Sequence, residues 1–253
     1  MFKSAWLKHK RAQRHIDDVA QIFTDFANAN PHRLSKQADP QTGSMSVRIK
    51  FGEDIPDEIA LSIGDAIHNL RSALDHMTWE LVGRDNGTQN RYLKLPTGDN
   101  RRNFESSCQG MVTPTQAVKD IFKGLEVFPG GDGQEIYNLH LLDNADKHTV
   151  LVPVIRATTL SKIVILKSNG TVAAKLTNIT LIGGNTPYTN VASIAPGLSV
   201  ELDEDTRATP DLFFSKVEGA PAEPVVPSLQ AFSRTVDAAL RKFENQARGL
   251  LGE

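Results

Sequence analysis

The chain has 253 residues, of which 40% are hydrophobic and 23% are charged, and its formal net charge is −2 at pH 7. This composition excludes disorder as the main state, and the near-neutral charge excludes a strong overall attraction to nucleic acid or to a membrane. The single cysteine excludes an intrachain disulfide and a four-cysteine zinc site, and no run reaches the roughly 20 apolar residues of a membrane span. We therefore expect a soluble cytoplasmic protein without a membrane partner.

Residues 3–29 are predicted to form an amphipathic helix, because apolar residues recur in it at spacings of three and four. Its first half is basic. The helix should end before Pro31, since proline disfavours a helical conformation in the residue that precedes it. Residues 31–43 are predicted to be a polar connection, and the alternation of apolar and polar residues over 45–51 predicts a β-strand.

The most regular pattern predicts a helix over residues 56–82, which acidic residues open and Gly83 follows. With successive side chains about 100° apart, nine apolar residues fall on one continuous face. These are Ile59, Ile63, Ala66, Ile67, Leu70, Ala73, Leu74, Met77 and Leu81. Leu61 and Trp79 fall on the opposite, polar side, which indicates that another helix or a second subunit covers that side.

Shorter elements are expected in the rest of the chain. Residues 88–113 show no pattern, whereas Thr113 and Pro114 are expected to open a short helix and residues 134–148 a further one. Between residues 149 and 214, five short β-like runs predict an antiparallel sheet or a small sandwich. A proline-rich linker at residues 218–227 should then precede a last amphipathic helix at residues 228–251.

Together these elements predict an α+β fold, in which four or five helices form a bundle and an antiparallel β-rich segment is inserted before the C-terminal helix. We expect a helical domain over residues 1–148 with one or two short strands. The β-rich segment should cover residues 149–217. The helix over residues 228–251 should pack back on the helical domain.

Polar and ionisable residues gather on the non-core side of the 56–82 helix. One stripe combines a carboxylate, an amide, a hydroxyl and an imidazole, from Asp65, Asn69, Ser72 and His76. An adjacent stripe contains His68, Arg71 and Asp75. The 134–148 helix offers a similar stripe of Tyr137, His140, Asn144 and His148. If the polar faces of the two helices meet, we expect Asp65, His76, His140 and His148 to converge.

The run from Arg71 to His76, RSALDH, fits an R-x4–6-H signature and resembles the HEPN superfamily of small helical ribonucleases and nucleotide-binding domains. The strings GDAIHNLRSALDH and LHLLDNADKH also resemble a widespread group of uncharacterised bacterial proteins. These similarities cover residues 60–82 and 134–150. The HEPN resemblance implies a protein that cleaves or binds RNA without a metal or other cofactor, with a defence or toxin-like role.

The same resemblance implies roles for individual residues. His76 would act as general acid or base, and Arg71 would bind the scissile phosphate. Asn69 and Ser72 would be supporting donors. On a continuous helix Arg71 and His76 are about 140° apart, so a helix start or a dimer would have to bring them together. The β-rich segment has no counterpart in the minimal HEPN domain.

Structural alternatives account for several of these residues. Arg71 with Asp75, and Asp143 with Lys147, have the i,i+4 spacing of ordinary helix ion pairs. A buried hydrogen-bond network between two helices would explain the polar stripes, because buried polar side chains need partners.

Two other functions remain open. In the first, the chain is a non-enzymatic interaction protein that forms a homodimer through its Trp79 side. In the second, the histidine-bearing helices bind a small ligand or a metal ion, with His76, His140 and His148 holding zinc or iron.

Overall fold

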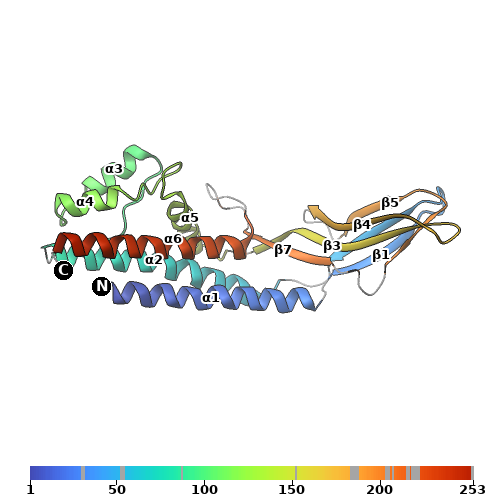
Figure 1. Cartoon of the computed structure of the whole chain (residues 1–253), viewed down its shortest axis with the longest axis horizontal. Helices are drawn as coiled ribbons and strands as arrows, with labels where there is room; N and C mark the ends of the chain where they lie inside the picture. The colour runs from blue at the N-terminus through green and yellow to red at the C-terminus, as the bar shows by residue number, and fades with distance from the viewer. Residues whose placement is uncertain are drawn as a thin grey trace. The chain divides into compact units, whose positions relative to one another are not determined.

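The computed structural model describes residues 1–29, 32–51, 55–86, 88–151, 153–182, 188–202, 206, 208–214, 217 and 223–251. Within these residues it confirms the α+β class, with six helices and seven strands (Figure 1). The helices are α1 (Lys3–Asn28), α2 (Asp57–Asn86), α3 (Arg101–Gln109), α4 (Gln116–Lys123), α5 (Gln134–Asp146) and α6 (Val225–Leu251). The strands are β1 (His32–Ala38), β2 (Met45–Phe51), β3 (Pro153–Lys167), β4 (Val172–Ile182), β5 (Tyr188–Ile194), β6 (Leu198–Glu201) and β7 (Ala208–Phe214). None of the described helices combines the length and hydrophobicity that a membrane span requires.

The chain divides into two compact units that interleave along the sequence. The helical unit contains Met1–Ala20, Glu58–Val152 and Phe214–Glu253. The β unit contains Gln21–Asp57 and Pro153–Phe213. Strands β1 and β2, which lie inside the 1–148 segment that we expected to be helical, therefore belong with the later strands.

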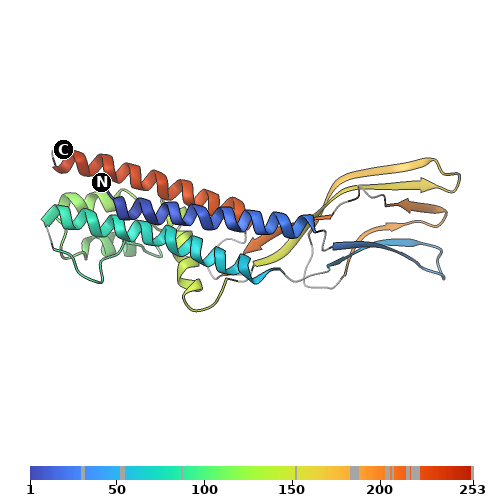
Figure 2. The same ribbon diagram turned by 90° about the horizontal axis from the view of Figure 1, so that it is seen from below.

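In the helical unit, α1, α2 and α6 run side by side (Figures 1 and 2). The apolar face predicted for α2 is confirmed, because all nine of its residues are buried. Helices α1 and α2 are antiparallel, since Ser4 contacts His76 whereas His15 lies near Asp65. His9 of α1 contacts Ser233 of α6, with 3.0 Å between Nε2 and Oγ, so polar contacts join all three helices.

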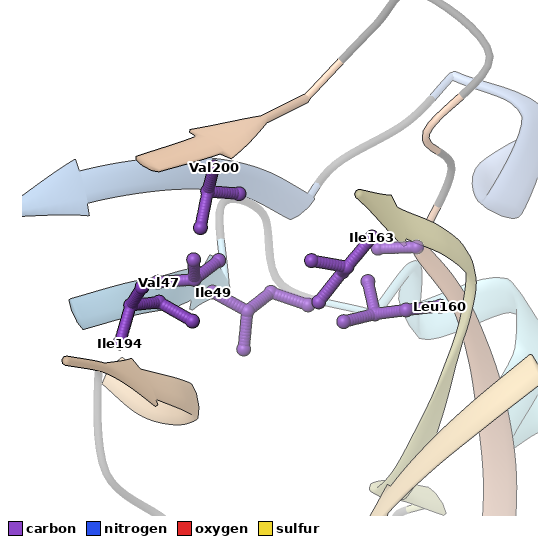
Figure 3. Close-up of a cluster of buried hydrophobic side chains, with 7 residues drawn as sticks. Val47, Ile49, Leu160, Ile163, Ile194 and Val200 are labelled. Atoms are coloured by element: carbon purple, nitrogen blue, oxygen red, sulfur yellow. The ribbon is translucent and has the colours of Figure 1, made fainter. Parts of the chain in front are cut away.

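The β unit contains a three-stranded sheet in the order β1-β2-β5 and a second sheet in the order β4-β3-β6, with β7 also paired to β3. Figure 2 shows the β1–β2 hairpin and the β3–β4 hairpin in separate layers. Apolar side chains from both sheets meet in one buried cluster, drawn in Figure 3. It consists of Val47, Ile49, Leu160, Ile163, Ile194, Val200 and Ala208.

Several expected elements differ from those found. Strand β1 lies in the expected polar connection and pairs with β2 along its whole length. Helix α3 lies in the stretch that lacked a pattern, and Asn100 caps it by accepting a hydrogen bond from the backbone N–H of Asn103 at 2.9 Å. The expected N-cap at Thr113 is wrong. Thr115 holds the cap position of α4, and its hydroxyl donates to Asp85 at 2.8 Å.

The β-rich region also has longer strands than expected. The five expected runs were VLVPVI, KIVIL, TVAAKL, NITLI and LSVEL. Strand β3 combines residues of the first two, β4 combines the third and fourth, and β5 and β7 were not among the runs. Residues 218–222 of the expected linker lie outside the described residues. Helix α6 begins inside that linker and has Pro227 in its first turn, where the missing N–H of proline is not needed.

Candidate functional site

The residue expected to bind phosphate, Arg71, is buried and holds another part of the chain. Arg71 is only 3% exposed, and its Nη2 donates to the carbonyl oxygen of Leu95 at 3.2 Å. Its Nη1 lies 2.9 Å from Oδ1 of Asp75, an ion pair without hydrogen-bond geometry. The same Asp75 oxygen accepts the backbone N–H of Leu95 at 2.9 Å. The expected i,i+4 pair therefore exists, but both of its residues hold the backbone of Leu95. We call this arrangement the Leu95 clamp.

His76 has a different environment from Arg71. Its Nδ1 lies 3.0 Å from Oγ of Ser4 in the first turn of α1. It borders an open groove of about 550 Å³, which we call the Trp79 groove. The groove is lined by Ser4, Asp75, His76, Trp79, Glu80, Gln89 and Leu93. Arg71 is not among these residues, so the structure does not bring Arg71 and His76 together at this groove.

The Trp79 groove has an aromatic wall and two carboxylates that already have partners. Trp79 is 40% exposed, which is a large exposed surface for an indole. Asp75 is paired with Arg71, and Glu80 lies 3.4 Å from Nη2 of Arg84 while accepting the backbone N–H of Phe2 at 3.0 Å. Since each carboxylate faces an arginine, the groove carries little net negative charge.

Two residues of the first stripe, Asp65 and Asn69, contact α1. Asn69 donates to the backbone carbonyl of Asp65 at 2.8 Å and accepts from Nζ of Lys8 at 3.3 Å. The Asp65 carboxylate is exposed and lies 4.0 Å from Nδ1 of His15. These contacts position helices and do not converge on the Trp79 groove.

Helices α2 and α5 do meet, but through other residues than those expected. Nδ1 of His68 lies 3.2 Å from Oδ1 of the buried Asp143, and Lys147 pairs with the other oxygen of the same carboxylate. The expected pair of Asp143 and Lys147 is therefore present. Ser72 lies beside this contact, with Oγ 3.4 Å from Nε2 of His68.

The expected convergence of Asp65, His76, His140 and His148 is wrong. His140 and Asn144 bond to each other at 3.0 Å within α5, and His148 is exposed beyond its end. In the part of the chain that the structure describes, no three His, Cys, Asp or Glu side chains are grouped so that they could hold a metal ion. The metal site proposed for His76, His140 and His148 is thus not assembled.

His140 is neutral at physiological pH, because its pKa lies well below 7. Burial, and then the nearby charges of Arg71 and Lys94, lower the pKa of His140 to about 4. Its Nδ1 is buried and has no hydrogen-bond partner among the described residues. A group with this pKa is poorly matched to acid–base catalysis near pH 7.

Sequence reasoning missed most of the groove. Glu80 follows His76 at i+4, so its place beside His76 had a helical signal. Ser4, Gln89 and Leu93 had none, because they reach the groove from other segments. Comparison of the chain with protein-family models, with curated proteins and with solved structures found no match.

Proposed function

We propose that the helical unit binds single-stranded RNA in the Trp79 groove. The observation that carries this proposal is the half-exposed Trp79 beside His76 in an open groove of about 550 Å³. Aromatic side chains in grooves bind single strands because every base offers a π-face that stacks on the ring. The paired state of Asp75 and Glu80 supports the proposal, since unpaired carboxylates would repel phosphate.

Exposed cations on α1 supply the phosphate contacts. Lys3, Lys10, Arg11 and Arg14 are all exposed and fall within an arc of about 100° of the helix surface. Ser4 borders this arc and also lines the groove. Among the described residues, no carboxylate lies within ion-pair distance of these four cations, although other arginines of the unit are paired. Lys and Arg that neutralise phosphates supply most of the sequence-independent affinity for nucleic acid.

This proposal favours binding over cleavage. An Arg71–His76 active site requires the Arg71 guanidinium to leave both Leu95 and Asp75, and a buried charge that loses its partners is costly. The ribonuclease activity and the defence or toxin-like role implied by the HEPN resemblance stay predictions.

The homodimer through the Trp79 side also stays a prediction. Leu61 and Trp79 are both exposed on the same side of α2, but they are 18 residues, or about 27 Å, apart along the helix. The contact between His68 and Asp143 of α5 lies between them. They therefore do not form one apolar patch on α2.

Fluorescence anisotropy with a labelled 12-nucleotide oligouridine tests the RNA-binding proposal. We expect Trp79→Ala to raise Kd by about tenfold, because stacking contributes about 1–3 kcal/mol per base. Leu61→Ala is the matched control, since Leu61 is 60% exposed on the same helix and lies outside the groove. A wild-type protein that binds no RNA at low salt, or equal Kd values for wild type and Trp79→Ala, would overturn the proposal.

The salt dependence provides a second readout for the cations. For a single strand, the slope of log K against log salt falls by about 0.7 for each lost phosphate contact. Lys10→Ala and Arg14→Ala are expected to reduce the slope by this amount. Lys175→Ala, an exposed lysine in the β unit, should leave it unchanged.

A further inference from the structure

A second groove lies next to the first and shares one of its walls. It has a volume of about 530 Å³ and is formed by residues of segments 90–97 and 107–113, and we call it the Tyr92 groove. Leu93 lines both grooves. Gln89 belongs to the Trp79 groove and Asn90 to the Tyr92 groove, so the chain passes from one groove to the other at this point.

The Tyr92 groove, like the Trp79 groove, has an exposed aromatic ring in its lining, and in addition it has a cation there. Tyr92 is 74% exposed. The Arg91 guanidinium lies 4.8 Å from the centre of the Tyr92 ring and donates to its hydroxyl at 2.6 Å, which fixes the ring and occupies one of its faces. Lys94 is the only charged residue among those that line this groove. An aromatic ring with adjacent cations is suited to a base and its phosphate.

The segment that separates the two grooves is fixed to α2 through the backbone of Leu95. Leu95 lines the Tyr92 groove, and both of its backbone polar groups are held by Arg71 and Asp75 of α2. Leu93 is two residues away from this anchor. A fixed wall lowers the conformational entropy that binding would otherwise cost. Arg71 and Asp75 are therefore positioning residues for the surface that the two grooves share.

We propose that one RNA strand occupies both grooves, with one base against Trp79 and another against Tyr92. This inference rests on the proposed RNA-binding function and extends it, because it requires unpaired bases over both grooves and one strand per chain. A duplex does not fit this arrangement, since its bases are stacked on one another and their faces are not available to the two rings.

Two measurements test the inference, isothermal titration with a 12-nucleotide oligouridine and photo-crosslinking of its 4-thiouridine form. We expect one strand per chain, a Kd about tenfold higher for Tyr92→Ala, and crosslinks near both Trp79 and Tyr92. Tyr92→Phe keeps the stacking ring but loses the hydrogen bond from Arg91, so its Kd should rise by less than that of Tyr92→Ala. Because Tyr92 is largely exposed, its substitution should leave the thermal unfolding temperature unchanged.

The possible outcomes separate this inference from the function on which it rests. If Trp79→Ala weakens binding while Tyr92→Ala does not, or if two strands bind per chain, the two-groove inference is wrong and the RNA-binding function stands. If the wild type binds no oligonucleotide, both are wrong. A 12-nucleotide DNA strand and an RNA duplex are the comparison ligands. Equal binding of DNA would widen the ligand to any single strand, and equal binding of the duplex would overturn the inference.

Discussion

Arg71 and Leu95 are 24 residues apart in the sequence, and a hydrogen bond of 3.2 Å from Nη2 of the arginine to the carbonyl oxygen of the leucine joins them. Asp75 completes the contact by accepting the N–H of Leu95 and pairing with the guanidinium. An ion pair at a buried position normally loses much of its attraction to the cost of desolvation. Here the two backbone hydrogen bonds offset part of that cost and fix the segment around Leu95 against α2.

Substitution of Asp75 tests this clamp. We expect Asp75→Ala to lower the free energy of unfolding by about 3 kcal/mol, because it leaves the buried Arg71 without its counter-charge and the Leu95 N–H without its acceptor. Urea denaturation measures the change. The matched control is Asp237→Ala, which breaks an exposed i,i+4 pair with Arg241 and should cost less than about 1 kcal/mol. If the two variants lose the same free energy of unfolding, Asp75 does not hold Leu95 as we infer.

A substitution at Gly64 tests how closely α2 packs against α5. A Cβ atom at this position would lie 2.7 Å from Oδ2 of Asp146, whose carboxylate also accepts a hydrogen bond from the backbone of Leu151. We expect Gly64→Ala to destabilise the protein by about 1–3 kcal/mol, although alanine is normally the better helix former.

The control for Gly64 is a second helical glycine with open surroundings. Beyond the adjacent residues and backbone of its own helix, no atom of the described residues lies within 4 Å of a Cβ at Gly249 of α6, so Gly249→Ala should be neutral or stabilise by up to about 1 kcal/mol. Adding Asp146→Ala to Gly64→Ala should recover part of the lost stability. Thermal unfolding of the four proteins measures these effects, and a stabilised Gly64→Ala would show that the helices can move apart at no cost.

The lowered pKa of His140 should make the stability of the folded protein fall at acidic pH. Its pKa in the folded protein is about 4, mainly because the side chain is buried, and the usual value for an unfolded chain is about 6.5. As the pH falls between these values, the unfolded chain binds the proton first, so the folded state loses stability. The stability that the neutral His140 contributes is fully present above about pH 6.5 and is lost progressively as the pH falls towards 4.

The comparison of His140→Gln with wild type isolates this effect from other groups. The variant should lose less stability than wild type when unfolding is measured at pH 7 and at pH 4.5. His148→Gln changes an exposed histidine just after the same helix and should follow the wild type. If His140→Gln and wild type lose the same stability, His140 is not a source of the pH dependence.

The local sequence pattern was sufficient to predict some helices and strands, but not others. The nine apolar residues of α2 were predictable because a wide apolar face repeats over the whole helix. Strand β1 was not, because its sequence HRLSKQA is mostly polar and it becomes a strand by pairing its backbone with β2. Helix α3 had a usable signal, the Asn100 cap followed by buried Phe104 and Cys108 at i,i+4 spacing.

The site was less predictable than the fold. The spacing of Arg71 and Asp75 indicated their ion pair, but nothing in the sequence indicated Leu95 as their shared partner. The histidines were expected to converge on the assumption that two polar faces meet in register. The contact instead forms between His68 and Asp143, because the position of α5 against α2 depends on packing that a helical pattern does not contain.

The pairing of β2 has a consequence for synthesis on the ribosome. The β1–β2 hairpin is local, but the other edge of β2 pairs with β5, and Arg48 donates to Asn190 across that edge at 3.1 Å over a separation of 142 residues. At about 5–20 residues per second, β5 emerges about 7–28 s after β2. During this interval the nascent chain carries an unpaired strand edge, which is open to wrong pairing with other chains. Early protection by chaperones should therefore raise the folding yield of this protein more than that of one with only local strand pairs.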